Sequence, residues 1–133
     1  MFDYHYMQLA IKQAEIAYKN NEVPVGAVIV LSGKIIASTY NMTITLGDPT
    51  AHAEMLAIRK GLELCYNAEM YVTLEPCPMC AQAIAFAKIK RLYFGAYNPQ
   101  GNIKTFIPEI YGGILESKCS FLLKDFFKEL RNE

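Results

Sequence analysis

The sequence has no excess of charge of either sign, because 13 basic residues balance 13 acidic residues in a chain of 133. Nucleic-acid binders usually carry surplus Lys and Arg, so this balance counts modestly against that class unless a local basic patch forms. No apolar run approaches the roughly 18–20 residues of a membrane span. Residues 1–6 lack a basic stretch followed by an apolar one, so we expect no secretory signal and a cytoplasmic location.

Histidine is scarce, with two residues, and cysteine occurs four times. In a cytosolic chain a Cys-x-x-Cys pair indicates metal or redox chemistry more often than a disulfide, and Cys77 and Cys80 form such a pair. Cys65 and Cys119 lie in helix-like apolar patterns, which predicts small buried hydrophobic residues. We expect His5 to be a surface or capping residue.

Two motifs carry the candidate catalytic chemistry. They are His52-Ala53-Glu54 and, further along the chain, Pro76-Cys77-Pro78-Met79-Cys80. These motifs supply one imidazole, two thiols and one carboxylate. Three protein ligands leave the fourth tetrahedral position of zinc open, as in catalytic rather than structural sites. The carboxylate is then free to move protons, so the pair of motifs predicts a water-activating zinc site.

The spacing within each motif predicts how the ligands meet. Cys77 and Cys80 are three residues apart at a predicted helix start, so they share one face, where the positive helix end favours thiolate. His52 and Glu54 are two apart and would diverge in a regular helix. They converge only if His52 lies at the irregular cap, with two helix starts meeting at one metal.

Each motif alone has other interpretations. A His-x-Glu triplet is more often a partly exposed helix start. A lone Cys-x-x-Cys is typical of a thiol-redox pair or of half a structural zinc knuckle. Redox motifs usually follow the first strand of a βαβ unit, whereas Cys77 follows the third predicted strand. A structural zinc knuckle needs four ligands. The two motifs together favour the catalytic zinc site.

A length of 133 residues, without repeats or linkers, predicts one domain, residues 1–133. Helices are expected over 4–20, 52–64, 78–88 and 115–130, and strands over 25–31, 34–39, 70–74 and 92–96. The stretches 40–50 and 97–113 are predicted loops, the second with at most a short fifth strand near Ile110. The inward residues expected in the first helix are Met7, Ala10, Ile11, Ala14 and Ala17. Those expected in the last are Phe121, Leu122, Phe126 and Leu130. A hairpin followed by β-α-β crossovers predicts a mixed α/β sheet with helices on both faces.

Three segments closely resemble the bacterial tRNA-specific adenosine deaminase family, within the cytidine/deoxycytidylate deaminase-like zinc deaminases whose H-x-E…P-C-x-x-C signature this chain carries. They are Glu22-Val23-Pro24-Val25-Gly26-Ala27-Val28, Asp48-Pro49-Thr50-Ala51-His52-Ala53-Glu54 and Tyr71-Val72-Thr73-Leu74-Glu75-Pro76-Cys77-Pro78-Met79-Cys80. The resemblance covers residues 4–96 and resumes at Gly113. It implies a three-layer, cytidine-deaminase-like α/β/α fold with a mixed, mostly five-stranded sheet, and usually a homodimer. The implied activity is hydrolytic deamination of the wobble adenosine in a tRNA anticodon stem-loop to inosine.

The resemblance also implies residue roles. His52, Cys77 and Cys80 would hold one Zn²⁺ per subunit, and Glu54 would carry protons from an activated water to the ring nitrogen and the departing ammonia. The implied substrate contacts are Asn41, which would hydrogen-bond the purine, Val25 and the Ala53 backbone, which would line the pocket, and Asn98.

Asn98 is also where the chain departs from the family, which commonly has an Asp within two residues of the segment Phe94-Gly95-Ala96. An uncharged Asn both donates and accepts hydrogen bonds. A role as a turn residue before Pro99 is equally consistent with the sequence. The stretch 97–112 is shorter than in the family, so we expect a differently built RNA groove.

Three functions therefore compete. The first is a tRNA adenosine deaminase, carried by the three matched segments. The second is a small-molecule nucleobase or nucleoside deaminase of guanine or cytosine type, suggested by the neutral charge and the short 97–112 stretch. The third is a non-enzymatic zinc-stabilised binding module, which would be insensitive to Glu54→Ala.

Overall fold

A five-stranded sheet forms the centre of the computed structural model, which describes residues 4–132. Residues 1–3, part of the segment inspected for a secretory signal, and residue 133 lie outside the described residues. The strands are β1 (Gly26–Leu31), β2 (Lys34–Tyr40), β3 (Glu69–Leu74), β4 (Arg91–Ala96) and β5 (Glu109–Tyr111), in the order β2-β1-β3-β4-β5. Strand β1 runs antiparallel to β2 and β3, whereas β3, β4 and β5 are parallel. The predicted mixed sheet is confirmed.

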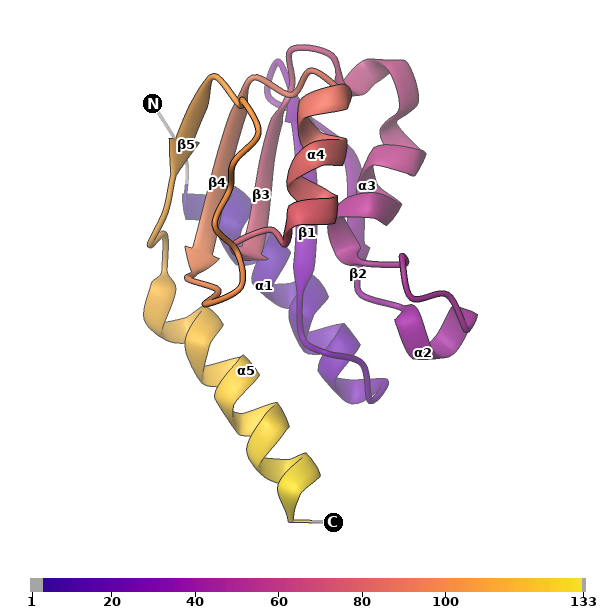
Figure 1. Ribbon diagram of the computed structural model, residues 1–133, viewed down its shortest axis with the longest axis vertical. Helices are drawn as coiled ribbons and strands as arrows, with labels where there is room; N and C mark the ends of the chain where they lie inside the picture. The colour runs from indigo at the N-terminus through magenta and orange to yellow at the C-terminus, as the bar shows by residue number, and fades with distance from the viewer. Residues whose placement is uncertain (1–3, 133) are drawn as a thin grey trace.

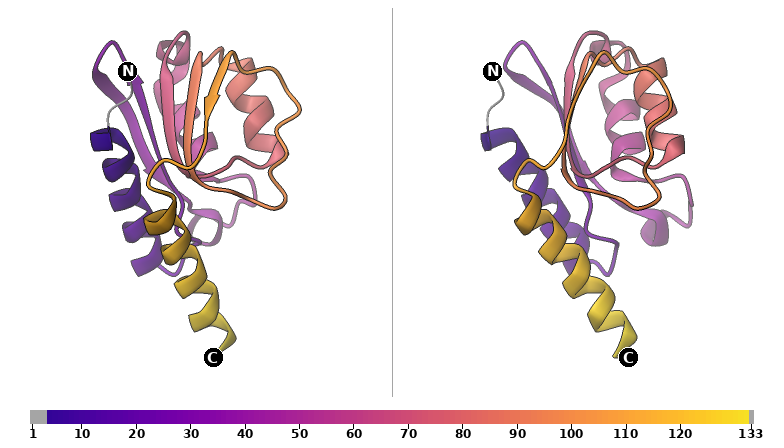
Figure 2. Two further views of the ribbon diagram at one scale, coloured as in Figure 1. Left: turned by 90° about the vertical axis from the view of Figure 1, so that its left-hand side faces the viewer. Right: turned by 60° about the vertical axis from the view of Figure 1, so that its left-hand side comes forward.

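Helices cover both faces of this sheet, which gives the predicted three layers (Figures 1 and 2). Helices α1 (Tyr4–Lys19) and α5 (Glu116–Arg131) lie on one face. Helices α3 (Ala53–Gly61) and α4 (Pro78–Phe86) lie on the other. Among residues 4–132, no helix combines the length and the apolar character that crossing a membrane requires.

Each face of the sheet has its own apolar core, because side chains alternate along the strands. Val28 and Tyr71 pack with Met7 beneath α1, while Ile29 and Val72 belong to the cluster under α3 and α4. The five residues predicted to face inward from the first helix are all buried. Helix α1 lies so close to β1 that only glycine fits at position 26, where a Cβ would stand 2.0 Å from the Ala10 carbonyl oxygen.

Two predicted segments differ from the structure. The expected loop 40–50 contains a short helix, α2 (Thr43–Leu46), whose backbone N–H groups at Ile44 and Thr45 donate to the Glu22 carboxylate. The helix expected over 52–64 ends at Gly61 and continues as a 3₁₀ turn, η1 (Leu62–Cys65). Leu62 has φ 51°, which a continuing right-handed helix cannot contain.

The prediction that Phe121 and Leu130 point inward is wrong, since they are 66% and 49% exposed. Helix α5 continues past the end of the sheet (Figure 1), so its last turns have little core to cover. Its buried side is instead the stripe Cys119, Leu122, Leu123 and Phe126, at helical spacing. The Phe126 ring packs edge-on against Tyr18 of α1, at a centroid distance of 5.6 Å.

Candidate active site

The predicted ligands lie where two helices begin. His52 is the N-cap of α3, with extended backbone at φ −71° and ψ 153°. Cys77 is the N-cap of α4, at φ −68° and ψ 169°, and Pro78 follows at the first helical position, where no N–H is needed. Cys80 lies in the first turn of the same helix. The expectation that His52 sits at an irregular cap is confirmed.

A tight turn before α3 delivers His52 to this position. The Thr50 backbone N–H and hydroxyl both donate to Asp48 Oδ1, at 2.9 and 2.7 Å. The His52 N–H then donates to the Thr50 carbonyl at 2.8 Å. The His52 imidazole therefore does not follow the side-chain spacing of a regular helix, so His52 and Glu54 can point into the same space.

The distances among the three candidate ligands fit zinc. His52 Nδ1 lies 3.7 Å from Cys77 Sγ and 3.5 Å from Cys80 Sγ, and all three ligand atoms lie within 4.8 Å of one another. Zinc bonds of about 2.3 Å to sulfur and about 2.0–2.1 Å to nitrogen place tetrahedral S and N ligands about 3.6 Å apart. Within residues 4–132 this group contains three donors, so a zinc ion held here keeps one coordination position for another ligand.

The charges in this cluster suit a metal cation. Hydrogen bonds with Cys80 and then with His52 lower the pKa of the Cys77 thiol to about 4. The pKa of Cys80 is raised by its hydrogen bond to Cys77 and by burial, and that of His52 is raised by its hydrogen bond with Cys77. One thiol is thus already held as a thiolate, the form that binds zinc.

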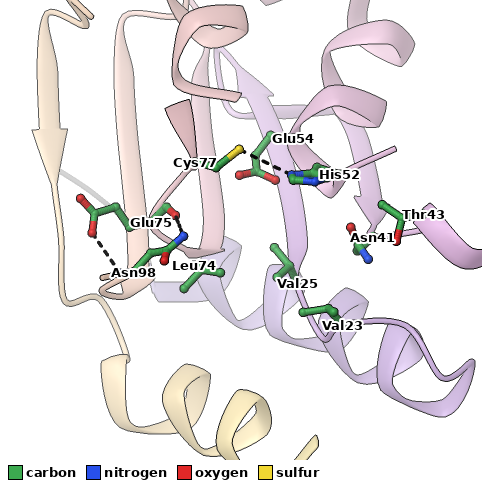
Figure 3. A pocket seen from close by; sticks show the side chains of 10 residues that line it. All are labelled: Val23, Val25, Asn41, Thr43, His52, Glu54, Leu74, Glu75, Cys77 and Asn98. Carbon is green, nitrogen blue, oxygen red and sulfur yellow. Dashed lines mark hydrogen bonds between the residues drawn. The ribbon is translucent and has the colours of Figure 1, made fainter. Parts of the chain in front are cut away.

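Glu54 stands beside the cluster and is only 4% exposed. Burial disfavours its charged form and raises its pKa to about 7. Figure 3 shows its carboxylate directed into the space between His52 and Cys77. A carboxyl group of this pKa, in this place, can both accept and return a proton near neutral pH.

A cavity of about 180 Å³ opens in front of these groups (Figure 3). It is smaller than the roughly 300–1,000 Å³ of sites for drug-sized ligands, so it has room for one base rather than a whole nucleotide. Its lining residues are Val23, Val25, Asn41, Thr43, His52, Glu54, Leu74, Glu75, Cys77 and Asn98. The predicted contacts Val25, Asn41 and Asn98 are therefore at the cavity.

Asn98 and Ala53 make hydrogen bonds within the protein. Asn98 Oδ1 accepts from the Gln100 N–H at 3.0 Å, and Asn98 Nδ2 donates to the Glu75 carbonyl at 3.4 Å, which supports the turn role. Ala53 is fully buried behind the lining residues, and its carbonyl accepts from the Thr39 hydroxyl at 2.7 Å. Contact of either residue with substrate stays a prediction.

Sequence reasoning missed several residues of this site. Leu74 ends β3 and Glu75 follows it, immediately before Pro76-Cys77, so their position beside the first thiol was a usable signal. Thr43 lies in the helix α2 that was predicted as loop. Cys65 and Cys119 are buried free thiols and His5 is exposed, as predicted.

Comparison with known proteins adds independent information. Residues 2–96 match the cytidine and deoxycytidylate deaminase zinc-binding region. The chain is 44% identical to a tRNA-specific adenosine deaminase of Agrobacterium fabrum (strain C58), covering 96% of this chain and 95% of that protein. It is 39% identical to the Bacillus subtilis protein of the same name, covering 96% and 90%.

A solved structure from work on adenosine-to-inosine editing by tRNA:A34 deaminases at the wobble position of transfer RNA superposes with a TM-score of 0.83. That protein is 43% identical, and the match covers 90% of this chain and 99% of the other.

Proposed function

Because the chain belongs to the zinc-binding cytidine and deoxycytidylate deaminase family, and within it to the tRNA-specific adenosine deaminases, we propose that it converts the wobble adenosine of a tRNA anticodon to inosine. The observation that carries this function is near full-length similarity to proteins named for that activity. The geometry agrees, because a three-donor site lies beside a buried carboxyl group and a base-sized cavity.

The reaction exchanges the adenine amino group for oxygen. A C–O bond forms at C6, the C6–N bond breaks, and water and adenosine become inosine and ammonia. His52, Cys77 and Cys80 would hold a Zn²⁺ ion, which would supply the nucleophile at neutral pH by lowering the pKa of a water molecule. Glu54 takes the proton that the water loses and delivers it to ring nitrogen N1. It then transfers the remaining proton of the new C6 hydroxyl to the amino group, which leaves as ammonia.

The cavity wall suits a purine. Val23, Val25 and Leu74 offer apolar surface for the ring faces, and the Asn41 amide offers hydrogen bonds to a ring edge. An anticodon loop presents its bases unpaired, so extruding one into a cavity of this size costs little.

The proposal extends to stoichiometry and assembly. Residues 1–133 would form one zinc-dependent deaminase domain that binds one Zn²⁺ through the single His/Cys/Cys group found among residues 4–132. The protein would act in the cytoplasm, with its tRNA substrate, as a homodimer. Exposed aromatic side chains near the cavity lined by Tyr66, Ala85 and Phe106 support an interface there.

The decisive experiment incubates the zinc-loaded protein with a tRNA that carries adenosine at the wobble position. We expect stoichiometric inosine and ammonia, and no product from the same tRNA with guanosine at that position. Free guanine, cytosine, adenosine and cytidine serve as parallel substrates. Ammonia release from one of these with no inosine in tRNA would replace the proposal with the small-molecule alternative.

A further inference from the structure

A second carboxylate is buried near the cavity and has no part in the zinc cluster. Glu22, just before β1, is 0% exposed. Its Oε1 accepts from the Ile44 N–H at 3.1 Å and from Asn41 Nδ2 at 3.4 Å. Its Oε2 accepts from the Thr45 N–H and the Thr45 hydroxyl, each at 2.6 Å. Burying a charge is costly unless it is hydrogen-bonded, and four donors meet that need.

These bonds determine how Asn41 faces the cavity. An ionised carboxylate can only accept hydrogen bonds, so the Asn41 amide must turn its NH₂ group toward Glu22. The amide then presents its oxygen and its second N–H elsewhere. In Figure 3 the Asn41 oxygen lies on the side of His52, and the nitrogen is turned away from it.

The same carboxylate fixes the segment that carries the neighbouring wall residue. Ile44 and Thr45 belong to α2, a helix of four residues that has no side-chain cap of its own. Thr43, at the start of α2, lines the cavity together with Asn41. One buried group thus holds both the backbone of this wall and the orientation of its amide.

We propose that Glu22 is a positioning residue for substrate recognition, which acts by fixing the Asn41 amide in the orientation that hydrogen-bonds the target base. This inference rests on the proposed deaminase function. It assigns specificity for the base edge to a pair, Glu22 and Asn41, rather than to Asn41 alone.

A double-mutant cycle tests the pairing, with kcat/KM for wobble inosine formation measured on wild type, Glu22→Gln, Asn41→Ala and the double variant. We expect Glu22→Gln to lower kcat/KM by about 10- to 100-fold, the cost of misplacing a recognition group. In the Asn41→Ala background the same change should matter by less than about threefold. Equal losses in both backgrounds would show that Glu22 acts without Asn41 and would overturn the inference.

Thr45→Val is the matched control, because it removes a donor from Glu22 Oε2 and leaves the bond to Asn41 in place. We expect a lower melting temperature with kcat/KM within about threefold of wild type. A loss as large as that of Glu22→Gln would assign the effect to α2 and reject the role of the amide.

If Glu22→Gln does not fold, stability still tests the contact. Asn41→Asp places two carboxylates together and should destabilise the protein, and adding Glu22→Gln should recover part of the loss because an amide again faces a carboxylate. No recovery would contradict the pairing. Absence of inosine with the wild-type enzyme would instead reject the proposed function, so the two failures are distinguishable.

Discussion

Glu54 is almost fully enclosed, at 4% exposed, and this burial raises the pKa of its carboxyl group to about 7. Replacing it with Gln keeps the shape and removes the exchangeable proton. We expect Glu54→Gln to retain zinc and fold but to lower kcat for inosine formation by about 10²- to 10⁴-fold, the usual contribution of a positioned acid–base group. Metal analysis and a single-turnover inosine assay provide the two measurements.

Glu63→Gln is the control for this change, because Glu63 is exposed in η1, two residues beyond the end of α3. It should leave both zinc content and turnover unchanged. Loss of zinc from the Glu54→Gln protein would mean that this carboxylate is a ligand rather than a proton carrier.

Asn98 gives a second residue-scale prediction. Removing its side chain frees the Gln100 N–H and the Glu75 carbonyl, so Asn98→Ala should lower the free energy of unfolding by about 1 kcal/mol. Urea denaturation measures this, with Gln100→Ala as the control, because that change keeps the backbone N–H. A rise in KM for tRNA with no change in stability would show instead that Asn98 serves the substrate.

The sequence was sufficient for the zinc group because ligand types and cap geometry are local properties. Three donors at two helix starts can meet in few ways. The turn that Asp48 forms just before α3 is a local sequence signal for the first of these starts. The role of Glu22 could not be predicted from the sequence, because its hydrogen-bond partners lie 19–23 residues further along the chain. Only the folded hairpin brings them together.

At the scale of elements, the contact between α1 and β1 depends on one missing side chain. A Cβ at position 26 would meet the Ala10 oxygen at 2.0 Å, and that oxygen belongs to the backbone of α1, so it cannot move alone. We expect Gly26→Ala to lower the free energy of unfolding by about 3 kcal/mol or more. Chemical denaturation checks this value.

Gly33→Ala provides the comparison in the adjacent turn. A Cβ there would have nothing within 4 Å, and the cost comes from φ +76° alone. This variant should lose about 1–2 kcal/mol. If the Gly26 variant lost no more than that, α1 could not be seated as closely as described.

The anchoring of α2 predicts a dependence on acid. Burial opposes ionisation of Glu22, but hydrogen bonds from Thr45 and Ile44 outweigh it and lower the pKa below the ordinary value of 4.5. A lowered folded-state pKa stabilises the protein above the unfolded-state pKa, and the contribution disappears as pH falls through the folded-state value. The stability difference between wild type and Glu22→Gln should therefore be largest near neutral pH and shrink below about pH 4.5.

Denaturation at about pH 7 and about pH 3 measures that difference. The exposed Glu63→Gln variant should match wild type at both values. A Glu22→Gln deficit that persisted unchanged in acid would show that packing, not charge, is responsible.

Most elements were predictable because their buried faces repeat at helix or strand periods. Helix α5 was the exception within its own pattern. The sheet and α1 are covered by the stripe Cys119, Leu122, Leu123 and Phe126, and Phe121 lies off this stripe and stays 66% exposed. Helix α2 was missed because its stabilising carboxylate lies in another segment.

At the scale of the whole molecule, exposed apolar side chains indicate where the proposed homodimer would form its interface. Phe86 and Phe106 are 75% and 79% exposed, and Tyr66, at 65%, shares a cavity with Phe106. Burying these side chains between two subunits would remove their apolar surface from water. Light scattering should give the mass of two chains for wild type and of one chain for Phe86→Asp.

Phe121→Asp is the matched change on α5, where the ring is 66% exposed. It should keep the mass of two chains. A single-chain mass for this variant, with two chains for Phe86→Asp, would move the interface to the opposite face of the sheet.

The two helix starts that meet at His52 and Cys77 belong to segments separated by 25 residues of chain. A metal ion held by both is therefore a cross-link, which closes a loop that contains η1 and β3. Treated as a disulfide of the same span, such closure removes about 3.5 kcal/mol of conformational freedom from the unfolded chain. Removing the metal with a chelator should therefore destabilise the fold as well as abolish activity, and proteases should cut first between α3 and α4.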